Sequence, residues 1–116
     1  MINEKLFKTS FSAIYNLYLN KIIRKNRTKE ELDEVIVWLT GYTLDELKEK
    51  QNSNINLEDF FNMAVNFNPK SNLIKGVVCG VRVEELEDGL MKKIRYLDKL
   101  VDELAKGKSL DKVFRI

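Results

Sequence analysis

The sequence predicts an all-α fold, a compact bundle of five to seven helices that forms a single domain over residues 1–116. Apolar residues recur at helical spacing along several segments, as they do on the buried face of a helix. Two segments open with the residues of a capping box, Thr28 with Glu31 and Thr43 with Glu46. Outside residues 73–86 no segment has a convincing strand pattern. Helices are therefore expected to supply almost the whole core.

The first predicted helix covers residues 11–25. Ser10 is placed to cap it, and the basic residues at its end suit the negative pole of a helix dipole. Two more helices follow on either side of Gly41, which stands where a left-handed C-terminal cap is needed. A short helix capped by Asn56 should end before Pro69.

The longest predicted helix begins after Asp88, which we expect to cap it, and ends at Gly107. Its apolar residues, spaced alternately by four and three, are Leu90, Ile94, Leu97, Val101 and Leu104. Since this seam extends over only about two heptads, we interpret it as a stripe facing the core of the same chain. Ser109 can cap a final helical turn.

Residues 73–86 allow two interpretations. We prefer a tightly packed helix, in which Cys79 is buried and Lys75 and Arg82 form a narrow polar stripe. The alternative is an α fold with one small β-hairpin at 73–86, although Cys-Gly is a weak turn pair beside Asn-Gly. The spacing of Gly76 and Gly80 does not fit a phosphate-binding loop.

Composition excludes several kinds of chemistry. The chain has no histidine, which removes imidazole bases and imidazole metal ligands, and its one cysteine cannot form a disulfide within the chain. Charged residues make up 33% of the chain with a net charge of +2, so no acidic partner is implied. No signal segment and no run of about 18 apolar residues is present, so we expect a cytoplasmic protein that does not enter a membrane.

Four carboxylates form the candidate metal site: Glu30, Glu34, Glu85 and Asp88. Their pattern resembles the acidic motifs of all-α nucleotide pyrophosphohydrolases, whose carboxylates hold Mg²⁺. The number of residues between the first pair, Glu30 and Glu34, and the second pair, Glu85 and Asp88, is much larger than in those enzymes. Glu30 also has a simpler role, because a carboxylate stabilises a helix N-terminus. Magnesium is accordingly an alternative, and we otherwise expect no cofactor.

The candidate ligand or interface residues are Lys75, Cys79, Arg82, Trp38 and Tyr42. We expect Cys79 to be an inert buried thiol and the two aromatic residues to be core anchors beside Gly41. The helix-turn-helix outline at 29–50 carries too many acidic residues to bind DNA, which leaves the basic residues 21–27 as the only candidate contacts for nucleic acid.

Two blocks, "RTKEELDEVIVWLTGYT" and "LIKGVVCGVRVEELEDGLMKKIRYLDKLVDELAKGK", resemble a bacterial family catalogued as domain of unknown function number twenty-two hundred. The resemblance extends from about Phe7 to Arg115 and departs at Gly89, where members have proline. It implies a small cytoplasmic bacterial protein and brings no activity, substrate or catalytic residue with it.

We therefore expect a protein-interaction module, more a binding protein than an enzyme. A homodimer through the Leu90–Leu104 helix or the Gly76/Gly80 face is one possibility, and an unknown protein partner is another. The alternative is Mg²⁺-dependent nucleotide binding or pyrophosphohydrolase-like activity. Nucleic-acid binding is the third hypothesis.

Overall fold

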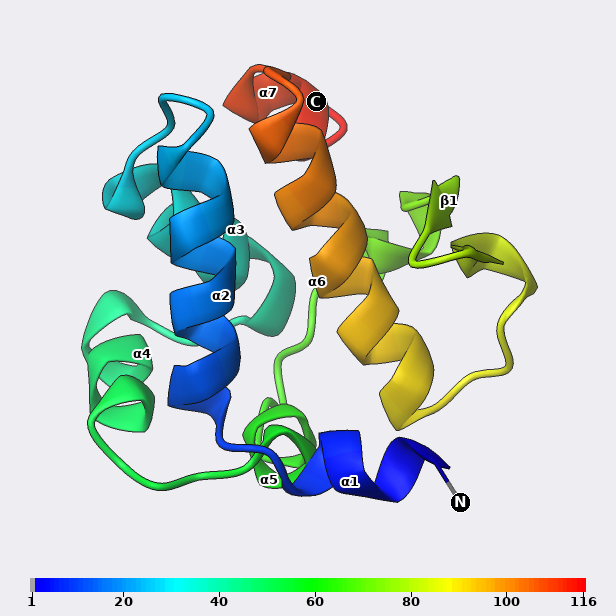
Figure 1. Cartoon of the computed structure of the whole chain (residues 1–116). Helices are drawn as coiled ribbons and strands as arrows, with labels where there is room; N and C mark the ends of the chain where they lie inside the picture. The colour runs from blue at the N-terminus through cyan, green and yellow to red at the C-terminus, as the bar shows by residue number, and fades with distance from the viewer. Residues whose placement is uncertain (1) are drawn as a thin grey trace.

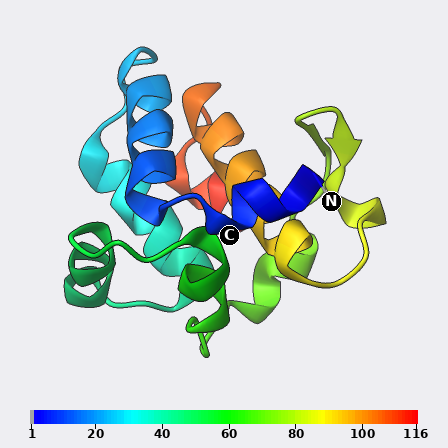
Figure 2. The same cartoon turned by 60° about the horizontal axis from the view of Figure 1, so that its bottom comes forward.

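The helix α6 (Leu90–Ala105) lies at the centre of the fold, and α2 (Phe11–Ile23), α3 (Lys29–Thr40) and α5 (Leu57–Asn62) all pack against it. Figures 1 and 2 show α2 on one side of α6 and the small hairpin on the other. Four residues of the predicted stripe are fully buried in the core: Ile94, Leu97, Val101 and Leu104. The interpretation of this stripe as core is confirmed, and the same residues are therefore not available as a dimer seam.

The computed structural model describes the backbone of residues 2–116 and the side chains of residues 4–116. The other elements are α1 (Ile2–Lys8), α4 (Leu44–Gln51), the 3₁₀-helix η1 (Pro69–Leu73), strands β1 (Val77–Val78) and β2 (Val81–Arg82), the 3₁₀-helix η2 (Val83–Glu85) and α7 (Leu110–Val113). The helical fold class is confirmed, with one two-stranded antiparallel sheet added to the helices. No helix in residues 2–116 is both long enough and apolar enough to cross a membrane.

Side-chain caps begin most of the helices where the sequence predicts them. The hydroxyl of Thr28 accepts from the amide of Glu31 at 3.2 Å, and Thr43 does the same for Glu46 at 3.1 Å. Each glutamate accepts in return from the amide of its threonine. Gly41 closes α3 with a φ of 78°, as predicted for a left-handed cap.

The preferred helix over residues 73–86 is wrong, and the hairpin alternative is correct. Strands β1 and β2 pair in antiparallel register, Val77 with Arg82 and Val78 with Val81. Cys79 and Gly80 form the two-residue connection with φ values of 52° and 78°. A turn with positive φ at both central residues matches the twist of the flanking strands, and a cysteine can occupy its first position at a modest cost. Gly80 therefore serves the turn, whereas Gly76 precedes β1 with a φ of 114° and lies close to the side chain of Lys99 on α6.

The start of α6 also differs from expectation, and so does the N-terminal segment. Gly89 is the N-cap of α6, with no side-chain hydrogen bond to the first turn, so the predicted capping by Asp88 is wrong.

Helix α1 was not predicted. It packs against α5 across the base of the view in Figure 1, and its polar sequence lacks a clear apolar stripe.

Arg27 joins the loop after α2 to the end of α6. Its Nη1 donates to the carbonyl oxygen of Leu104 at 3.2 Å and to that of Lys108 at 2.7 Å. Its Nη2 lies 2.7 Å from the carboxylate of Glu31. The guanidinium thus supplies donors to carbonyls near the C-terminal end of α6, where a helix leaves acceptors without partners of its own.

Candidate functional site

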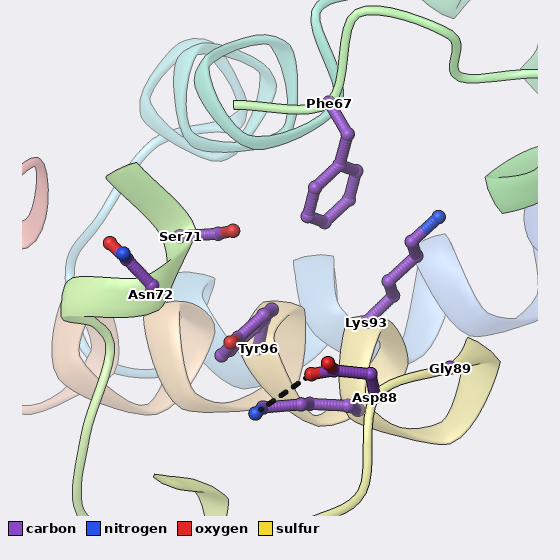
Figure 3. A pocket seen from close by; sticks show the side chains of 8 residues that line it. Phe67, Ser71, Asn72, Asp88, Gly89, Lys93 and Tyr96 are labelled. Carbon is purple, nitrogen blue, oxygen red and sulfur yellow. Dashed lines mark hydrogen bonds and ion pairs between the residues drawn. The ribbon is translucent and has the colours of Figure 1, made fainter. Parts of the chain in front are cut away.

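A hollow of about 280 Å³ lies between η1 and the first turns of α6. Figure 3 shows its walls, with Phe67 reaching in from the loop before η1 and Lys93 and Tyr96 from α6. The lining residues are Phe67, Ser71, Asn72, Asp88, Gly89, Lys92, Lys93 and Tyr96. Its size is near the lower end of the range for small-molecule sites, so it fits a small ligand.

Asn68 positions η1 and with it one wall of the hollow. Its side-chain oxygen accepts from the amide of Lys70 at 2.9 Å, and its Nδ2 donates to the carbonyl of Trp38 at 3.0 Å. Its backbone amide donates to the carbonyl of Leu39. The first of these bonds caps η1 and the other two fix its start to the end of α3, so Ser71 is held by an ordered backbone.

Ser71 is the buried polar group of the hollow. The residue is only 8% exposed, and its hydroxyl points toward the space between Phe67 and Tyr96 in Figure 3. Within residues 2–116 no hydrogen-bond partner for this hydroxyl is present. The hydroxyl oxygen itself is open to the hollow, so it is free to donate a hydrogen bond to a ligand or a water molecule there.

The start of α6 forms another wall of the hollow. Gly89 has a φ of 145°, which a residue with a side chain rarely adopts, and a Cβ built there would meet no atom within 4 Å. No side chain caps the helix, so the amides of its first turn have no acceptor from a cap. An exposed helix N-terminus with free amides attracts negative charge.

Two lysines add positive charge to the hollow. The Nζ of Lys93 lies 5.1 Å from the centre of the Phe67 ring, and no carboxylate of the described chain forms an ion pair with it. Lys92 has a partner, because its Nζ lies 3.3 Å from the carboxylate of Asp88. Desolvation lowers the pKa of Lys92, but Asp88 and Tyr96, through their hydrogen bonds and charges together, outweigh this effect and hold the pKa above its usual value.

A second hollow, of about 180 Å³, ends at the carboxylate of Asp98. This carboxylate accepts from the hydroxyl of Tyr18 at 2.5 Å and from Nη1 of Arg95 at 2.7 Å. The Sγ of Cys79 lies 3.8 Å from it. Burial, with the charge of Asp98, raises the pKa of the Tyr18 hydroxyl well above its usual value. All the polar groups here have partners inside the protein, so this network has a structural role.

Cys79 is exposed at the tip of the hairpin, so the expectation of a buried thiol is wrong. Partial desolvation of the thiol, together with the negative charge of Asp98, still raises its pKa above its usual value. The thiol is therefore accessible but protonated at neutral pH, which makes it a weak nucleophile.

The four carboxylates of the predicted magnesium site lie in three different places. Glu30 and Glu34 border a hollow of about 450 Å³ beside Leu44 and Lys48. Glu85 lies in η2 with Arg82 3.8 Å away, and Asp88 belongs to the hollow at α6. Over residues 2–116 no group of three or more acidic or cysteine side chains is arranged to hold a metal ion.

The remaining candidate residues lie away from the hollow at α6. Trp38 stacks on Phe114 with ring centres 5.4 Å apart, and the hydroxyl of Tyr42 donates to the carbonyl of Phe60 at 2.6 Å, so both are core anchors as expected. Lys75 and Arg82 are exposed on the hairpin and do not line a hollow in the described part of the chain.

Part of the basic segment 21–27 is already occupied by contacts within the protein. Lys21 lies 3.5 Å from the carboxylate of Asp102, and Arg27 is bound by Glu31 and by carbonyls near the end of α6. Fewer cations of this segment are therefore available to phosphate groups than the sequence suggests.

Sequence reasoning missed Phe67, Ser71 and Lys93. The sequence indicates only a loop at residues 66–71, and it assigns no role to Lys93. The run Asn68-Pro69 does indicate an ordered turn, since asparagine before proline favours turn initiation. Nothing in the local sequence indicates that this turn faces the start of α6.

Fold and site together define a small helical protein with a positively charged hollow of ligand size at the start of its central helix. The chain belongs to the bacterial family described as "Uncharacterized protein conserved in bacteria (DUF2200)", whose model matches residues 5–115. The chain is also similar to a solved structure titled "Crystal structure of uncharacterized protein SP1917", with 40% identity and a TM-score of 0.91. That similarity covers 97% of this chain and 92% of the other. No curated protein matches the chain.

Proposed function

We propose that this protein binds a small anionic molecule in the hollow at the start of α6. The observation that carries the proposal is the hydroxyl of the largely buried Ser71, which has no hydrogen-bond partner in residues 4–116 and faces the same space as the uncapped N-terminus of α6. A ligand there would restore a hydrogen bond to Ser71 and would receive donors from the first turn of the helix.

The other walls support the same kind of ligand. Lys93 has no acidic partner in the described chain and stands over Phe67, so it can turn toward a bound anion without breaking an ion pair. Phe67 and Tyr96 supply apolar surface for the uncharged part of the molecule. No side chain near Ser71 is placed to remove its proton, and the proposed role is therefore binding and not catalysis.

The test is a titration followed by two-dimensional amide NMR, with isobutyrate and inorganic phosphate as probes. We expect at least one of them to shift the amide signals of Ser71, Gly89 and Leu90 in a saturable manner. Ser71→Ala should weaken binding roughly tenfold, because it removes a hydrogen bond to a charged group. Lys93→Gln should weaken it by a factor of about five, from the loss of one charge near the anion.

Lys112→Gln is the matched control, because it removes the same charge from α7 on a residue that does not line the hollow. It should leave the affinity within about twofold of the wild type, since an exposed charge at a distance is screened. Equal losses in Lys93→Gln and Lys112→Gln would show nonspecific attraction and contradict the proposal.

Self-association is a second candidate, supported by a different observation. Leu17 is 64% exposed on α2 and borders the second hollow, the one that ends at Asp98. The apolar walls of that hollow include Leu6, Ile14 and Leu57. A second copy of the chain could insert its own Leu17 there. Light scattering across a concentration series should detect a dimer that Leu17→Lys abolishes, and a monomer at all concentrations would count against it.

A further inference from the structure

The charges around the hollow at α6 indicate which anion it accepts, and Asp88 is the group that decides. Two lysines and one carboxylate line the hollow, and its remaining side chains are uncharged. Asp88 already neutralises Lys92, with Nζ and Oδ1 3.3 Å apart. Of the two lysines that line the hollow, only Lys93 therefore has no acidic partner in residues 4–116.

We infer that the ligand is a small monocarboxylate and that Asp88 acts as a fixed counter-ion that disfavours phosphate dianions. This rests on the proposed function. A single negative charge would complement Lys93 and the start of α6, and the complex would carry no excess charge. A dianion would leave one negative charge uncompensated beside Asp88 in a partly enclosed space, where charge is more costly than in water.

The geometry of the ion pair allows Asp88 to act in this way. Its carboxylate is fully exposed, whereas the side chain of Lys92 is only 17% exposed against Tyr96. The side chain of Lys92 is therefore held by the residues packed around it. The carboxylate of Asp88 is held mainly by its ion pair with Lys92. An exposed pair of this type contributes little to stability, so Asp88 can be changed without loss of the fold.

The polar and apolar walls fit the same ligand class. A carboxylate group has two acceptor oxygens, so one can bind Lys93 or the first-turn amides while the other accepts from the hydroxyl of Ser71. The carbon skeleton would then lie against Phe67 and Tyr96.

The test compares isobutyrate with methyl phosphate at pH 7.5, where the phosphate is a dianion because its second pKa is about 6. Both are titrated by calorimetry against the wild type, Asp88→Asn and Asp111→Asn. The Asp111→Asn variant removes the same charge from an exposed site on α7. We expect the wild type to bind isobutyrate more tightly than methyl phosphate.

In Asp88→Asn both affinities should rise, because one repulsive charge and one competitor for Lys92 are removed. The dianion gains about twice the electrostatic free energy of the monoanion, so the ratio of the two affinities should move roughly fivefold toward methyl phosphate. Asp111→Asn should leave the ratio unchanged.

The outcomes separate this inference from the proposed function. Tighter binding of methyl phosphate to the wild type, or an unchanged ratio in Asp88→Asn, overturns the inference while an anion site that depends on Lys93 remains. Absence of binding by every probe, with no shift of the Ser71 and Gly89 amides, overturns both.

Discussion

Arg115 and Glu103 form a two-pronged ion pair, with Nη1 2.6 Å from Oε1 and Nη2 2.9 Å from Oε2. The glutamate side chain is only 4% exposed, and the arginine reaches it from the end of the chain after α7. A carboxylate buried to this degree needs a partner, because water cannot solvate it. The pair therefore fixes the C-terminal residues to the central helix.

Arg115→Met should lower the free energy of unfolding by about 3 kcal/mol, because it leaves Glu103 buried without its main partner. Lys8→Met is the control, since Lys8 forms an exposed ion pair with Glu58 at 3.1 Å. That change should cost less than about 1 kcal/mol. Urea denaturation of both variants provides the measurement, and equal losses would show that the Arg115–Glu103 pair contributes no more than a surface contact.

Gly41→Ala and Gly80→Ala should differ strongly in stability although both residues have a φ of 78°. In each case alanine suffers the left-handed backbone penalty of about 1–2 kcal/mol. Only at Gly41 would the new methyl group also overlap the backbone carbonyl of Asn66, whereas the space beside Gly80 is open. Gly41→Ala should therefore cost more than about 4 kcal/mol.

Thermal and urea denaturation of the two glycine variants measure this difference directly. Similar losses at the two positions would mean that the contact between Gly41 and Asn66 is relaxed at little cost, contrary to the tight packing of this turn.

Alkaline pH should destabilise the protein through its buried tyrosines. Burial raises the pKa of Tyr15 and of Tyr42 from 10.0 to about 12, and for Tyr15 the neighbouring Asp33 adds to the effect. Between pH 10 and pH 12 these tyrosine hydroxyls lose their protons in the unfolded chain but keep them in the folded chain. The stability linked to these groups is fully present below pH 10 and is lost as the pH rises toward 12.

The free energy of unfolding, measured in urea at several values between pH 9 and pH 12, checks this expectation. Tyr42→Phe should lower stability by about 1 kcal/mol at neutral pH, from the lost hydrogen bond to Phe60, and should also flatten the alkaline decline. An unchanged slope in this variant would contradict the role of Tyr42.

The thiol of Cys79 should react more slowly with a disulfide reagent at pH 8 than an unperturbed cysteine, despite its exposure, because its pKa is raised above its usual value. Desolvation is the main cause, and the charge of Asp98 adds to it. Asp98→Asn should lower that pKa and accelerate the reaction, while Asp111→Asn should leave the rate unchanged. A rate that does not respond to Asp98→Asn would show that the carboxylate does not influence the thiol.

The helices with local signals were predictable, and the elements defined by distant contacts were not. Thr28, Thr43 and Gly41 act through bonds to residues three or four positions away, so their roles follow from short stretches of sequence. The hairpin was misjudged because Cys79 adopts a positive φ that its residue type does not indicate. Helix α1 was missed because its packing against α5, more than its own pattern, accounts for it.

The hollow at α6 was beyond local sequence reasoning for the same reason. Ser71 and Lys93 are separated by a hairpin and a 3₁₀-helix, and only the folded chain brings them to one space. Asp88 was singled out from sequence as a helix cap and as a metal ligand. The structure places it beside Lys92, where the two side chains form an ion pair at the edge of the hollow.

The position of α6 near the end of the sequence has a consequence for synthesis on the ribosome. Helices α2, α3 and α5 bury their apolar faces against α6, which leaves the ribosome after them. Arg27 likewise donates hydrogen bonds to the carbonyls of Leu104 and Lys108, which are synthesised much later. The core around α2, α3 and α5 therefore stays incomplete until residues 90–108 have left the ribosome, and its apolar faces are exposed until then.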